Sequence, residues 1–253
     1  MKEILDLNGK VAIVTGATKG LGYGMALKLA NHGANIVVAS RTVEDCRKVA
    51  DEIESIGNEV LSCPTDVSKK IQVDKLVEST VEKFGKIDIL VNNAGVGITK
   101  LAKDLTEEEW DNVVDIDLKG VFLVAQSVSK VMIKQNSGNI INIASLGGII
   151  SSSRLIPYMA AKAGVIHMTK GLAVEWAKYN IRVNGVAPGY VLTPLTEKVV
   201  NNKKTYKALT GLTPMRRLGT VDEIANVVLF LASDASTYIT GETIIVDGGR
   251  HAL

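Results

Sequence analysis

Seven short runs rich in Val and Ile recur along the chain, each bounded by turn residues, at residues 11–14, 35–39, 59–63, 87–91, 138–144, 181–187 and 243–246. Runs of this length and composition are typical of strands that are covered on both faces. Between the runs, apolar residues follow helical spacing, as in Val73, Leu76, Val77 and Val81 before Gly85. Because parallel strands need crossover connections, the pattern predicts an α/β fold: a seven-stranded parallel sheet with helices on both faces.

No linker, repeat or low-complexity tract interrupts this alternation, which indicates a single domain over residues 1–253. The least regular stretch is residues 189–220, with Pro194, Pro214 and a polar run at 201–204. A long irregular excursion in a compact domain is more often functional than slack. We therefore expect a flexible substrate lid here, the alternative being a mobile surface loop.

Composition excludes several classes of protein. Hydrophobic residues make up 46% and charged residues 22% of the chain, as in globular proteins and unlike disordered ones. Lys and Arg number 29 against 27 Asp and Glu, a balance that argues against a nucleic-acid or acidic-membrane partner. Cys46, Cys63 and three histidines cannot supply repeated metal-ligand spacings, so we expect no metal site.

The location is expected to be the cytoplasm. The uncharged stretch 135–153 contains too many Ser, Asn and Gly residues for a bilayer core. An acid at Glu3 stands where a signal peptide would begin its apolar run. Two cysteines at this chain length fit a reducing compartment.

A glycine cluster follows the first predicted strand and leads into a helix. Three residues separate its first and second glycines and one residue separates the second and third, whereas the more usual fingerprint has one and then two residues between its glycines. Glycine lets the backbone approach a pyrophosphate, and a helix N-terminus offers free N–H groups and a partial positive charge. In the first βα unit this favours nucleotide binding over a plain tight turn, with contacts expected from Gly16, Thr18, Lys19, Gly20, Leu21 and Gly22.

The end of the second predicted strand bears on the choice of dinucleotide. An acid here would bind the adenosine ribose and favour NAD(H), but the chain has Ser40 followed by Arg41. A guanidinium binds phosphate through charge-assisted hydrogen bonds worth roughly 1.5–3 kcal/mol, and Lys19 adds a second positive charge. These residues predict NADP(H) as the preferred cofactor, with NAD(H) as the second choice; the alternative is two solvated surface cations.

Of the six tyrosines, only Tyr158 has a lysine four places later, at Lys162. Residues four apart on a helix share a face, so the two side chains are expected to lie together. The pair opens a predicted helix, although one such pair among six tyrosines arises by chance about half the time. Ser145 lies at the carboxyl end of a predicted strand, which is the edge where ligands bind in open α/β sheets.

Several motifs now stand in order along the chain: the glycine cluster, Asn92-Asn93-Ala94-Gly95, Ser145, Tyr158 with Lys162, and Pro188-Gly189. Over about residues 7–249, the chain resembles the short-chain dehydrogenase/reductase family. The resemblance implies an extended Rossmann fold. It also implies an oxidoreductase that transfers a hydride between NAD(P)(H) and a carbonyl or secondary alcohol.

The resemblance also implies roles for three side chains. Tyr158 is the expected general acid toward a carbonyl or base toward an alcohol, yet a free phenol, with a pKa of about 10, is poorly matched to neutral pH. Lys162 is the expected cation that favours the phenolate and holds the nicotinamide ribose; one charge about 4 Å away at an effective dielectric near 20 supplies about 4 kcal/mol. Ser145 is expected to orient the substrate oxygen, the alternative being an ordinary strand-end hydroxyl.

Asp117 departs from the family's pattern. The family commonly has Asn in the segment that here spans residues 115–120, and that residue's backbone carbonyl holds a water linking the lysine to solvent. A backbone role survives the change, so the resemblance implies Asp117 as a fourth catalytic residue. Its carboxylate is also expected to strengthen proton binding at Lys162 or to alter the relay.

Further cofactor contacts are implied by the resemblance. Asp66, followed by Val67, matches the adenine-binding acid, although it can also serve as a helix N-cap before Ser68. The other positions expected to border the cofactor are Asn93, Gly95, Pro188, Gly189, Val191 and Thr193.

Three substrate classes stay open. Carrier-bound 3-oxoacyl thioesters need a basic docking face, for which Lys134 and Lys178 are present, but Asn136 and Tyr179 stand where arginine is often found. Residues 175–184 resemble sugar-acid dehydrogenases rather better.

Arg154 suits the carboxylate of a sugar acid such as gluconate, or is a surface cation. A hydrophobic ketone or steroid would suit a group of apolar residues, namely Leu146, Ile149, Leu155, Ile156 and Leu192. We expect a small-molecule carbonyl or alcohol substrate.

The alternative to an enzyme is a non-catalytic NADP(H)-sensing or scaffold protein, which has no need of Ser145, Tyr158 and Lys162 together. Members of the family are commonly tetramers, built through helices that here lie near residues 113–132 and 160–178. The resemblance therefore implies a homotetramer.

Overall fold

The computed structural model describes residues 3–193, 196–197 and 202–253. One seven-stranded sheet has the order β3-β2-β1-β4-β5-β6-β7, and every pairing is parallel. The strands are β1 (Val11–Thr15), β2 (Asn35–Ser40), β3 (Val60–Pro64), β4 (Ile89–Asn92), β5 (Gly138–Ile143), β6 (Ile181–Pro188) and β7 (Thr243–Val246). Their bounds follow the Val/Ile runs closely, so the predicted sheet is confirmed.

The central strands carry apolar side chains on both faces because both faces are covered. Successive residues of a strand point to opposite sides. In β1, Ala12 and Val14 pack into one hydrophobic cluster, whereas Val11 and Ile13 pack into another on the opposite face. This explains why the Val/Ile runs are apolar at successive positions instead of alternating between apolar and polar residues.

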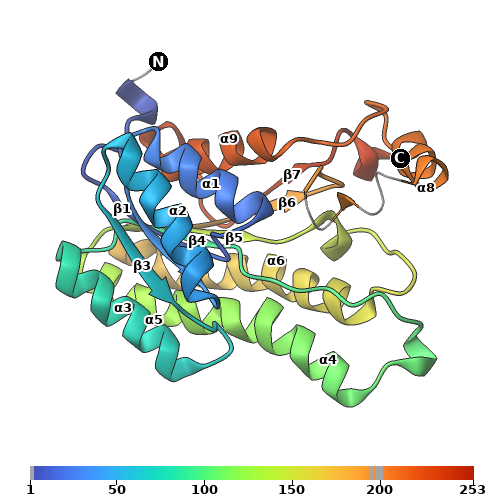
Figure 1. The fold of residues 1–253 in the computed structure, drawn as a ribbon, viewed down its shortest axis with the longest axis horizontal. Coiled ribbons are helices and arrows are strands. Elements are labelled where there is room, and N and C mark those ends of the chain that lie inside the picture. The colour runs from blue at the N-terminus through green and yellow to red at the C-terminus, as the bar shows by residue number, and fades with distance from the viewer. Residues whose placement is uncertain (1–2, 194–195, 198–201) are drawn as a thin grey trace.

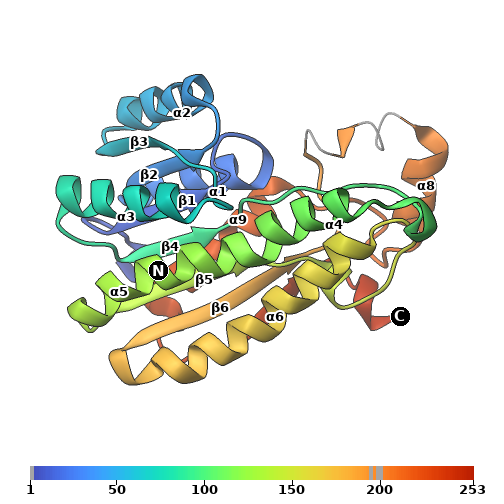
Figure 2. The ribbon, with the colours of Figure 1, turned by 90° about the horizontal axis from the view of Figure 1, so that it is seen from below.

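Helices form the two outer layers (Figures 1 and 2). One face carries α1 (Gly20–Ala30), α2 (Val43–Ile56) and α9 (Val221–Ala232). The other carries α3 (Lys70–Phe84), α5 (Val121–Gln135) and α6 (Ile156–Trp176). The predicted arrangement of helices on both faces is thus confirmed.

A π-helical turn, η3 (Asp115–Gly120), joins α4 (Glu107–Val114) to α5. Thr106 begins α4 with a capping box, in which its hydroxyl accepts from Glu109 N and the Glu109 carboxylate accepts from Thr106 N. A π-helical turn inserts one residue into the helical repeat, so it changes which side chains face inward. In η3 the buried residues are Asp117 and Gly120.

The stretch 189–220 is more regular than the sequence indicates. It contains α8 (Lys203–Gly211). Asn202 is the N-cap of this helix, and its side-chain oxygen accepts from Lys204 N and Thr205 N at 3.1 Å each. A parallel bridge between Val191 and Gly219 closes the two ends of the stretch. Part of the expected lid, including Pro194 and the first residue of the polar run, lies outside the described residues, and the lid itself stays a prediction.

Within the part of the chain that the structure describes, no helix is long and apolar enough to cross a membrane. The same residues contain no group of three or more His, Cys, Asp or Glu side chains placed to hold a metal ion.

Candidate active site

The candidate site lies at the carboxyl ends of β1, β4 and β5. After β1 the chain builds outward to β2 and β3, whereas β4 pairs with the other edge of β1. This reversal of strand order creates a crevice beyond the strand ends, which is the place where open α/β sheets bind ligands. The glycine cluster, Asn93 and Ser145 all follow these strands directly.

The glycine cluster has the backbone geometry that a dinucleotide requires. Gly16 and Gly20 have left-handed φ angles of 64° and 56°, which favour glycine. A Cβ at Gly22 would lie 2.1 Å from Gly16 O, so a side chain there would push the turn apart. At Lys19, the N-cap of α1, no side chain caps the helix, and its first turn has no acid. The N–H groups of this turn therefore fit a pyrophosphate.

The cluster is fixed to β4 by a pair of residues. Thr15, fully buried, accepts at Oγ1 from Asn93 N (2.9 Å) and Ala94 N (3.0 Å). Asn93 returns a bond by donating its side-chain amide to Thr15 O at 2.9 Å. Thr15 is not among the residues that the sequence places at the site. Its signal was a hydroxyl at the end of an otherwise apolar strand.

On the adenosine side, the structure places Thr18 and Ser40 together but gives Lys19 a partner. Thr18 Oγ1 donates to Ser40 Oγ at 3.1 Å, which ties the glycine cluster to the end of β2. Lys19 Nζ lies 3.0 Å from Asp45 Oδ2 on α2, while Arg41 is exposed. Asp45 is not expected at the site from the sequence, because charge alone does not show which acid a lysine reaches across a turn.

Asp66 is held by a local turn rather than by a helix. Its Oδ1 accepts from Ser68 N at 3.0 Å and from Ser68 Oγ at 2.8 Å. Since α3 begins later, with Lys69 as its N-cap, Asp66 is not the cap of that helix. Val67 is buried, and a Cβ at Gly120 would lie 2.8 Å from Val67 Cγ2.

Tyr158 and Lys162 lie on one face of α6, as predicted. Pro157 at the start of the helix suits the first turn because its missing N–H would have no intrahelical partner. Lys162 Nζ lies 5.7 Å from the centroid of the Tyr158 ring. It donates to Ile143 O at 3.1 Å, and Lys162 is only 3% exposed.

Ser145 meets this pair through two glycines. Its Oγ accepts from Gly147 N at 3.1 Å. A Cβ at Gly147 would lie 3.4 Å from Ser145 Oγ and 3.6 Å from Tyr158 Cε1, so the hydroxyl and the ring border the same small space. Gly148 packs directly on the α6 backbone at Lys162. The structure therefore brings the three predicted side chains together.

Asp117 approaches Lys162 with its side chain. Asp117 Oδ2 lies 3.2 Å from Lys162 Nζ, and Oδ1 accepts from Val96 N at 2.7 Å. The carboxylate is fully buried, and this burial raises the pKa of Asp117 even though the Lys162 charge opposes the shift. No sequence signal points to Val96, which takes part through its backbone alone.

The segment after β6 follows the carboxyl end of the strand beside β5. Pro188 ends the strand, and Gly189 N donates to Val246 O at 2.9 Å. Thr193 N donates to Thr196 Oγ1 at 2.9 Å, which folds this segment on itself. Val191 is buried at its bridge to Gly219.

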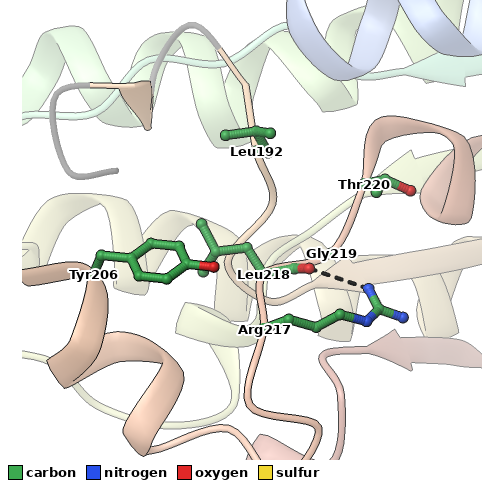
Figure 3. A pocket seen from close by; sticks show the side chains of 6 residues that line it. All are labelled: Leu192, Tyr206, Arg217, Leu218, Gly219 and Thr220. Atoms are coloured by element: carbon green, nitrogen blue, oxygen red, sulfur yellow. Dashed lines mark hydrogen bonds between the residues drawn. The ribbon is translucent and has the colours of Figure 1, made fainter. Parts of the chain in front are cut away.

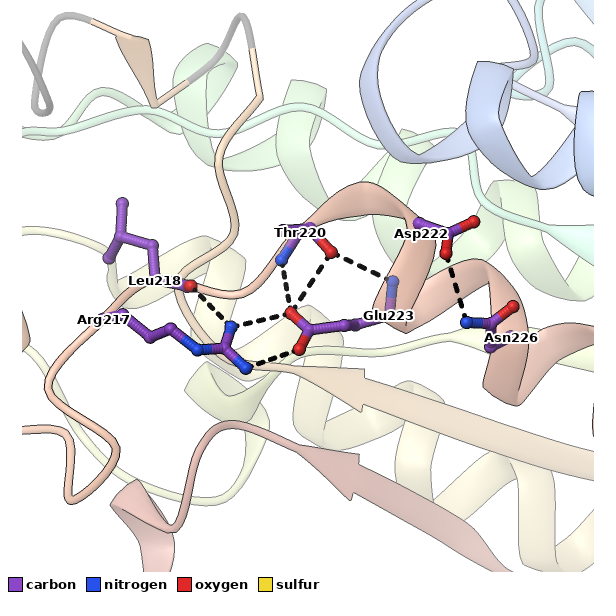
Figure 4. A network of polar contacts seen from close by, with 6 residues as sticks. All are labelled: Arg217, Leu218, Thr220, Asp222, Glu223 and Asn226. Carbon is purple, nitrogen blue, oxygen red and sulfur yellow. Dashed lines mark hydrogen bonds and ion pairs between the residues drawn. The ribbon is translucent and has the colours of Figure 1, made fainter.

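A cavity of about 260 Å³ lies beside this segment (Figure 3). It is lined by Leu192, by Tyr206 of α8 and by residues 217–220. Arg217 is held in place by Glu223, with nitrogen–oxygen distances of 2.6 and 2.9 Å (Figure 4). This bidentate pair lowers the pKa of Glu223 to about 2.

The mouth of the site is formed by two loops. Lys100 N donates to Arg154 O at 2.9 Å, which joins the loop after β4 to the loop before α6. Arg154 has a left-handed φ of 70° and an exposed side chain. Of the apolar residues singled out from the sequence, Ile149, Ile156 and Leu192 are 44%, 42% and 52% exposed.

Known proteins resemble the chain over nearly its whole length. A family model described as enoyl-(acyl carrier protein) reductase matches residues 16–251. The 3-oxoacyl-(acyl-carrier-protein) reductase of Thermotoga maritima is 43% identical over 245 residues, which cover 97% of this chain and 99% of the relative. A solved short-chain type dehydrogenase/reductase from Mycobacterium marinum is 39% identical, with a TM-score of 0.93 and coverage of 98% of each chain.

A second solved structure is a gluconate 5-dehydrogenase from Burkholderia cenocepacia in complex with NADP and tartrate. It is 36% identical, with a TM-score of 0.96, and the match covers 100% of this chain and 99% of that one. The chain belongs to the short-chain dehydrogenase/reductase family. It is an oxidoreductase that transfers a hydride between a nicotinamide cofactor and a carbonyl or secondary alcohol.

Proposed function

We propose that Tyr158, Lys162 and Ser145 carry the reaction, with Tyr158 as the group that gives a proton to a carbonyl or takes one from an alcohol. The observation that carries this assignment is the buried Lys162 ammonium 5.7 Å from the Tyr158 ring. A positive charge in a low-dielectric setting favours the phenolate, so the proton becomes easier to move at neutral pH. Ser145 Oγ borders the same space and can donate to the substrate oxygen.

The residues present fit a dinucleotide. The uncapped N-terminus of α1 offers N–H donors, and the tight contact at Gly22 keeps the turn that presents them. The nicotinamide ring, when bound, supplies or accepts the hydride. The proposed contacts along the crevice run from the glycine cluster to Thr193, with Asp66 and Val67 toward the adenine and Asn93, Gly95, Pro188, Gly189 and Val191 beside the rest of the cofactor.

Replacing Tyr158 with Phe tests the assignment. Phe keeps the ring but removes the proton, so turnover should fall by about 10²–10⁴-fold, the usual contribution of general acid–base catalysis. Cofactor affinity, measured by fluorescence titration, should stay within about twofold. Tyr179→Phe removes a hydroxyl from the far end of the same helix region and serves as the control. Unchanged turnover in Tyr158→Phe would refute the assignment. If the protein with its natural sequence binds the cofactor but converts no substrate of a broad panel, it is instead the non-catalytic sensor or scaffold.

We propose NADP(H) as the preferred cofactor, with NAD(H) accepted more weakly. Ser40 stands where an acid would favour NAD(H), and Arg41 is exposed beside it. The NADP in the solved gluconate 5-dehydrogenase supports the same preference for a relative of this fold. Asp45 opposes the preference for NADP(H), because its carboxylate lies 3.0 Å from Lys19 Nζ and offsets part of the positive charge of Lys19.

The substrate is proposed to be a small carbonyl or alcohol, with sugar acids and 3-oxoacyl thioesters as the leading classes. Relatives named for both reactions share the full length of the chain. Arg154 at the mouth suits a carboxylate, and the exposed apolar residues there suit an acyl chain. A panel of gluconate-type acids, 3-oxoacyl thioesters and hydroxysteroids, followed by NADPH absorbance, distinguishes these classes.

We further propose a cytoplasmic homotetramer that needs no metal, nucleic acid or membrane. Val174, near the end of α6, is 84% exposed, and Phe122 at the start of α5 is 37% exposed. Large apolar side chains exposed on these two helices support an interface between copies. Light scattering after size-exclusion chromatography gives the mass directly, and a mass of one chain would contradict the tetramer.

A further inference from the structure

The buried contact between Asp117 and Lys162 is not needed to build a tyrosine–lysine pair. Lys162 Nζ already has a hydrogen-bond acceptor in Ile143 O at 3.1 Å. A second, charged partner at 3.2 Å adds a full negative charge at a site where Asp117 is fully buried and Lys162 is 3% exposed. Burying a carboxylate costs free energy unless a cation and hydrogen bonds compensate.

The surrounding backbone holds the carboxylate against the lysine. Val96 N donates to Asp117 Oδ1 at 2.7 Å, so the group cannot turn away without losing a buried hydrogen bond. A Cβ at Gly95 would lie 2.8 Å from Asp117 Oδ2 and 3.4 Å from Lys162 Nζ. Gly95 therefore lies directly against the contact, and a larger residue at position 95 would clash with the Asp117 carboxylate.

In the π-helical turn Asp117 points inward, whereas Asp115 and Lys119 stay at the surface. Asp115 pairs with Lys119 at 3.1 Å, and their side chains are 44% and 56% exposed. Asp117, two residues after Asp115, is buried. Residues two apart on a helix point to nearly opposite sides, so Asp117 faces the interior where Asp115 faces solvent.

The other charged groups on the packed elements lie at the surface. Besides Lys162, the titratable groups of α6 are the half-buried Tyr158 and the exposed His167, Lys170 and Glu175. The charged residues of α4 and α5 are exposed or half-buried, namely Glu107, Glu108, Glu109, Asp111, Lys130 and Lys134. Lys162 is thus the charged group in direct contact with Asp117 among the described residues.

From this geometry we infer that Asp117 positions Lys162 and balances part of its charge. The Asp117 carboxylate thereby opposes ionisation of the Tyr158 phenol. The inference rests on the proposed function of Tyr158 and Lys162. Asp117 fixes Lys162 Nζ beneath the tyrosine and offsets part of its charge. A neutral side chain at position 117 leaves the ammonium unopposed, so Tyr158 releases its proton at a lower pH.

Asp117→Asn is the first test. The amide keeps the size of the carboxylate and can still accept from Val96 N, so folding, checked by circular dichroism, is expected to persist. Tyrosinate absorbance is titrated in this variant and in Asp117→Asn combined with Tyr158→Phe, and the difference isolates the Tyr158 phenol. The midpoint should fall by about one to two pH units relative to the same pair on the natural sequence, the effect of removing one charge about 6–12 Å away at an effective dielectric near 20.

Two further variants keep the test decisive. Asp115→Asn removes an exposed carboxylate from the same turn and should leave the midpoint within about 0.2 units, because solvent screens that charge. If Asp117→Asn does not fold, Asp117→Ser also removes the charge with a smaller side chain and should shift the midpoint in the same direction. A folded charge-free variant with an unchanged midpoint overturns the inference.

Turnover supplies an independent readout. Once a substrate is known, the pH profile of alcohol oxidation in Asp117→Asn should move to lower pH by the same amount, because oxidation needs the deprotonated tyrosine. The optical titration requires no substrate, so its failure is distinguishable from failure of the proposed reaction. Loss of turnover without any shift in the titration would mean that Asp117 only supports the local structure.

Discussion

The molecule contains two ion pairs of similar length in opposite surroundings. Arg217 and Glu223 meet at 2.6 Å beside the cavity near α8, with 50% and 40% of their side chains exposed (Figure 4). Lys162 and Asp117 meet at 3.2 Å in the interior. The surface pair lowers the pKa of Glu223 to about 2, whereas burial raises the pKa of Asp117. The same chemistry thus has opposite effects on an acid, because desolvation outweighs attraction only in the interior.

The two pairs also differ in what they connect. Glu223 accepts from Thr220 N and closes the capping box at the start of α9, so the surface pair belongs to helix capping. Asp117 connects η3, the loop after β4 and α6, three segments distant in sequence. Loss of the Arg217–Glu223 pair should therefore have only a local effect, whereas loss of the Lys162–Asp117 pair should disturb the proposed catalytic group.

The largest effect is expected from Lys162→Met. The change leaves the Asp117 carboxylate buried without its cation, which typically costs about 3–5 kcal/mol of stability. Turnover should fall by orders of magnitude. Kinetics and chemical denaturation measure the two effects, and Lys119→Met, which removes the exposed partner of Asp115, should show neither.

The pH dependence of Lys162→Met has a defined sign. A carboxyl whose pKa is raised on folding binds more protons in the folded state, so stability falls as pH rises from about 4 through the folded pKa. The loss relative to the natural sequence should therefore grow toward alkaline pH. A loss independent of pH between 5 and 9 would instead show that Asp117 stays ionised over this range in the variant, so that removing Lys162 does not raise the pKa of Asp117 into it.

A smaller effect is expected at the Lys19–Asp45 pair, which is 72% and 26% exposed. Asp45→Asn frees Lys19, so NADPH should bind about three- to tenfold more tightly, by about 1 kcal/mol, with little change for NADH. Isothermal titration calorimetry at low and high salt measures both affinities. Arg41→Ala should act in the opposite direction, and equal effects on the two cofactors would contradict the proposed preference.

The smallest effect is expected from Glu223→Gln. The amide still accepts from Thr220 N, so only the charge of an exposed pair is lost, which is worth less than about 1 kcal/mol. Because the folded pKa is depressed to about 2, the stabilisation is present above pH 4.5 and disappears as pH falls toward 2. Urea denaturation at pH 7 and pH 3, with and without 1 M salt, checks the magnitude. A loss as large as that of Lys162→Met would remove the contrast between the two pairs.

Much of the fold and part of the site could be predicted because they depend on local patterns. Buried parallel strands must be apolar on both faces, so the Val/Ile runs fixed their positions before any contact was known. Tyr158 and Lys162 share a helical face whatever the helix packs against. The glycine cluster marks a turn that side chains cannot occupy, as the contact of Gly22 with Gly16 O confirms.

Other features had no local signal. The α8 helix within residues 189–220 is short and has few apolar residues, and Val96 acts through its backbone, which any residue would provide. Asp45 reaches Lys19 across the gap between two helices. Periodicity describes single elements and does not show which surfaces meet.

The sequence by itself determined the succession of strands and helices along the chain, the glycine turn after the first strand, and the helical spacing that puts Tyr158 and Lys162 on one face. Only the tertiary structure decided the surroundings of Asp117: whether its carboxylate faces water, as Asp115 does, or the ammonium of Lys162. The physical reason is that the pKa of an acid depends on burial and on partners brought together from distant segments. Neither is a property of the residue or of its neighbours along the chain.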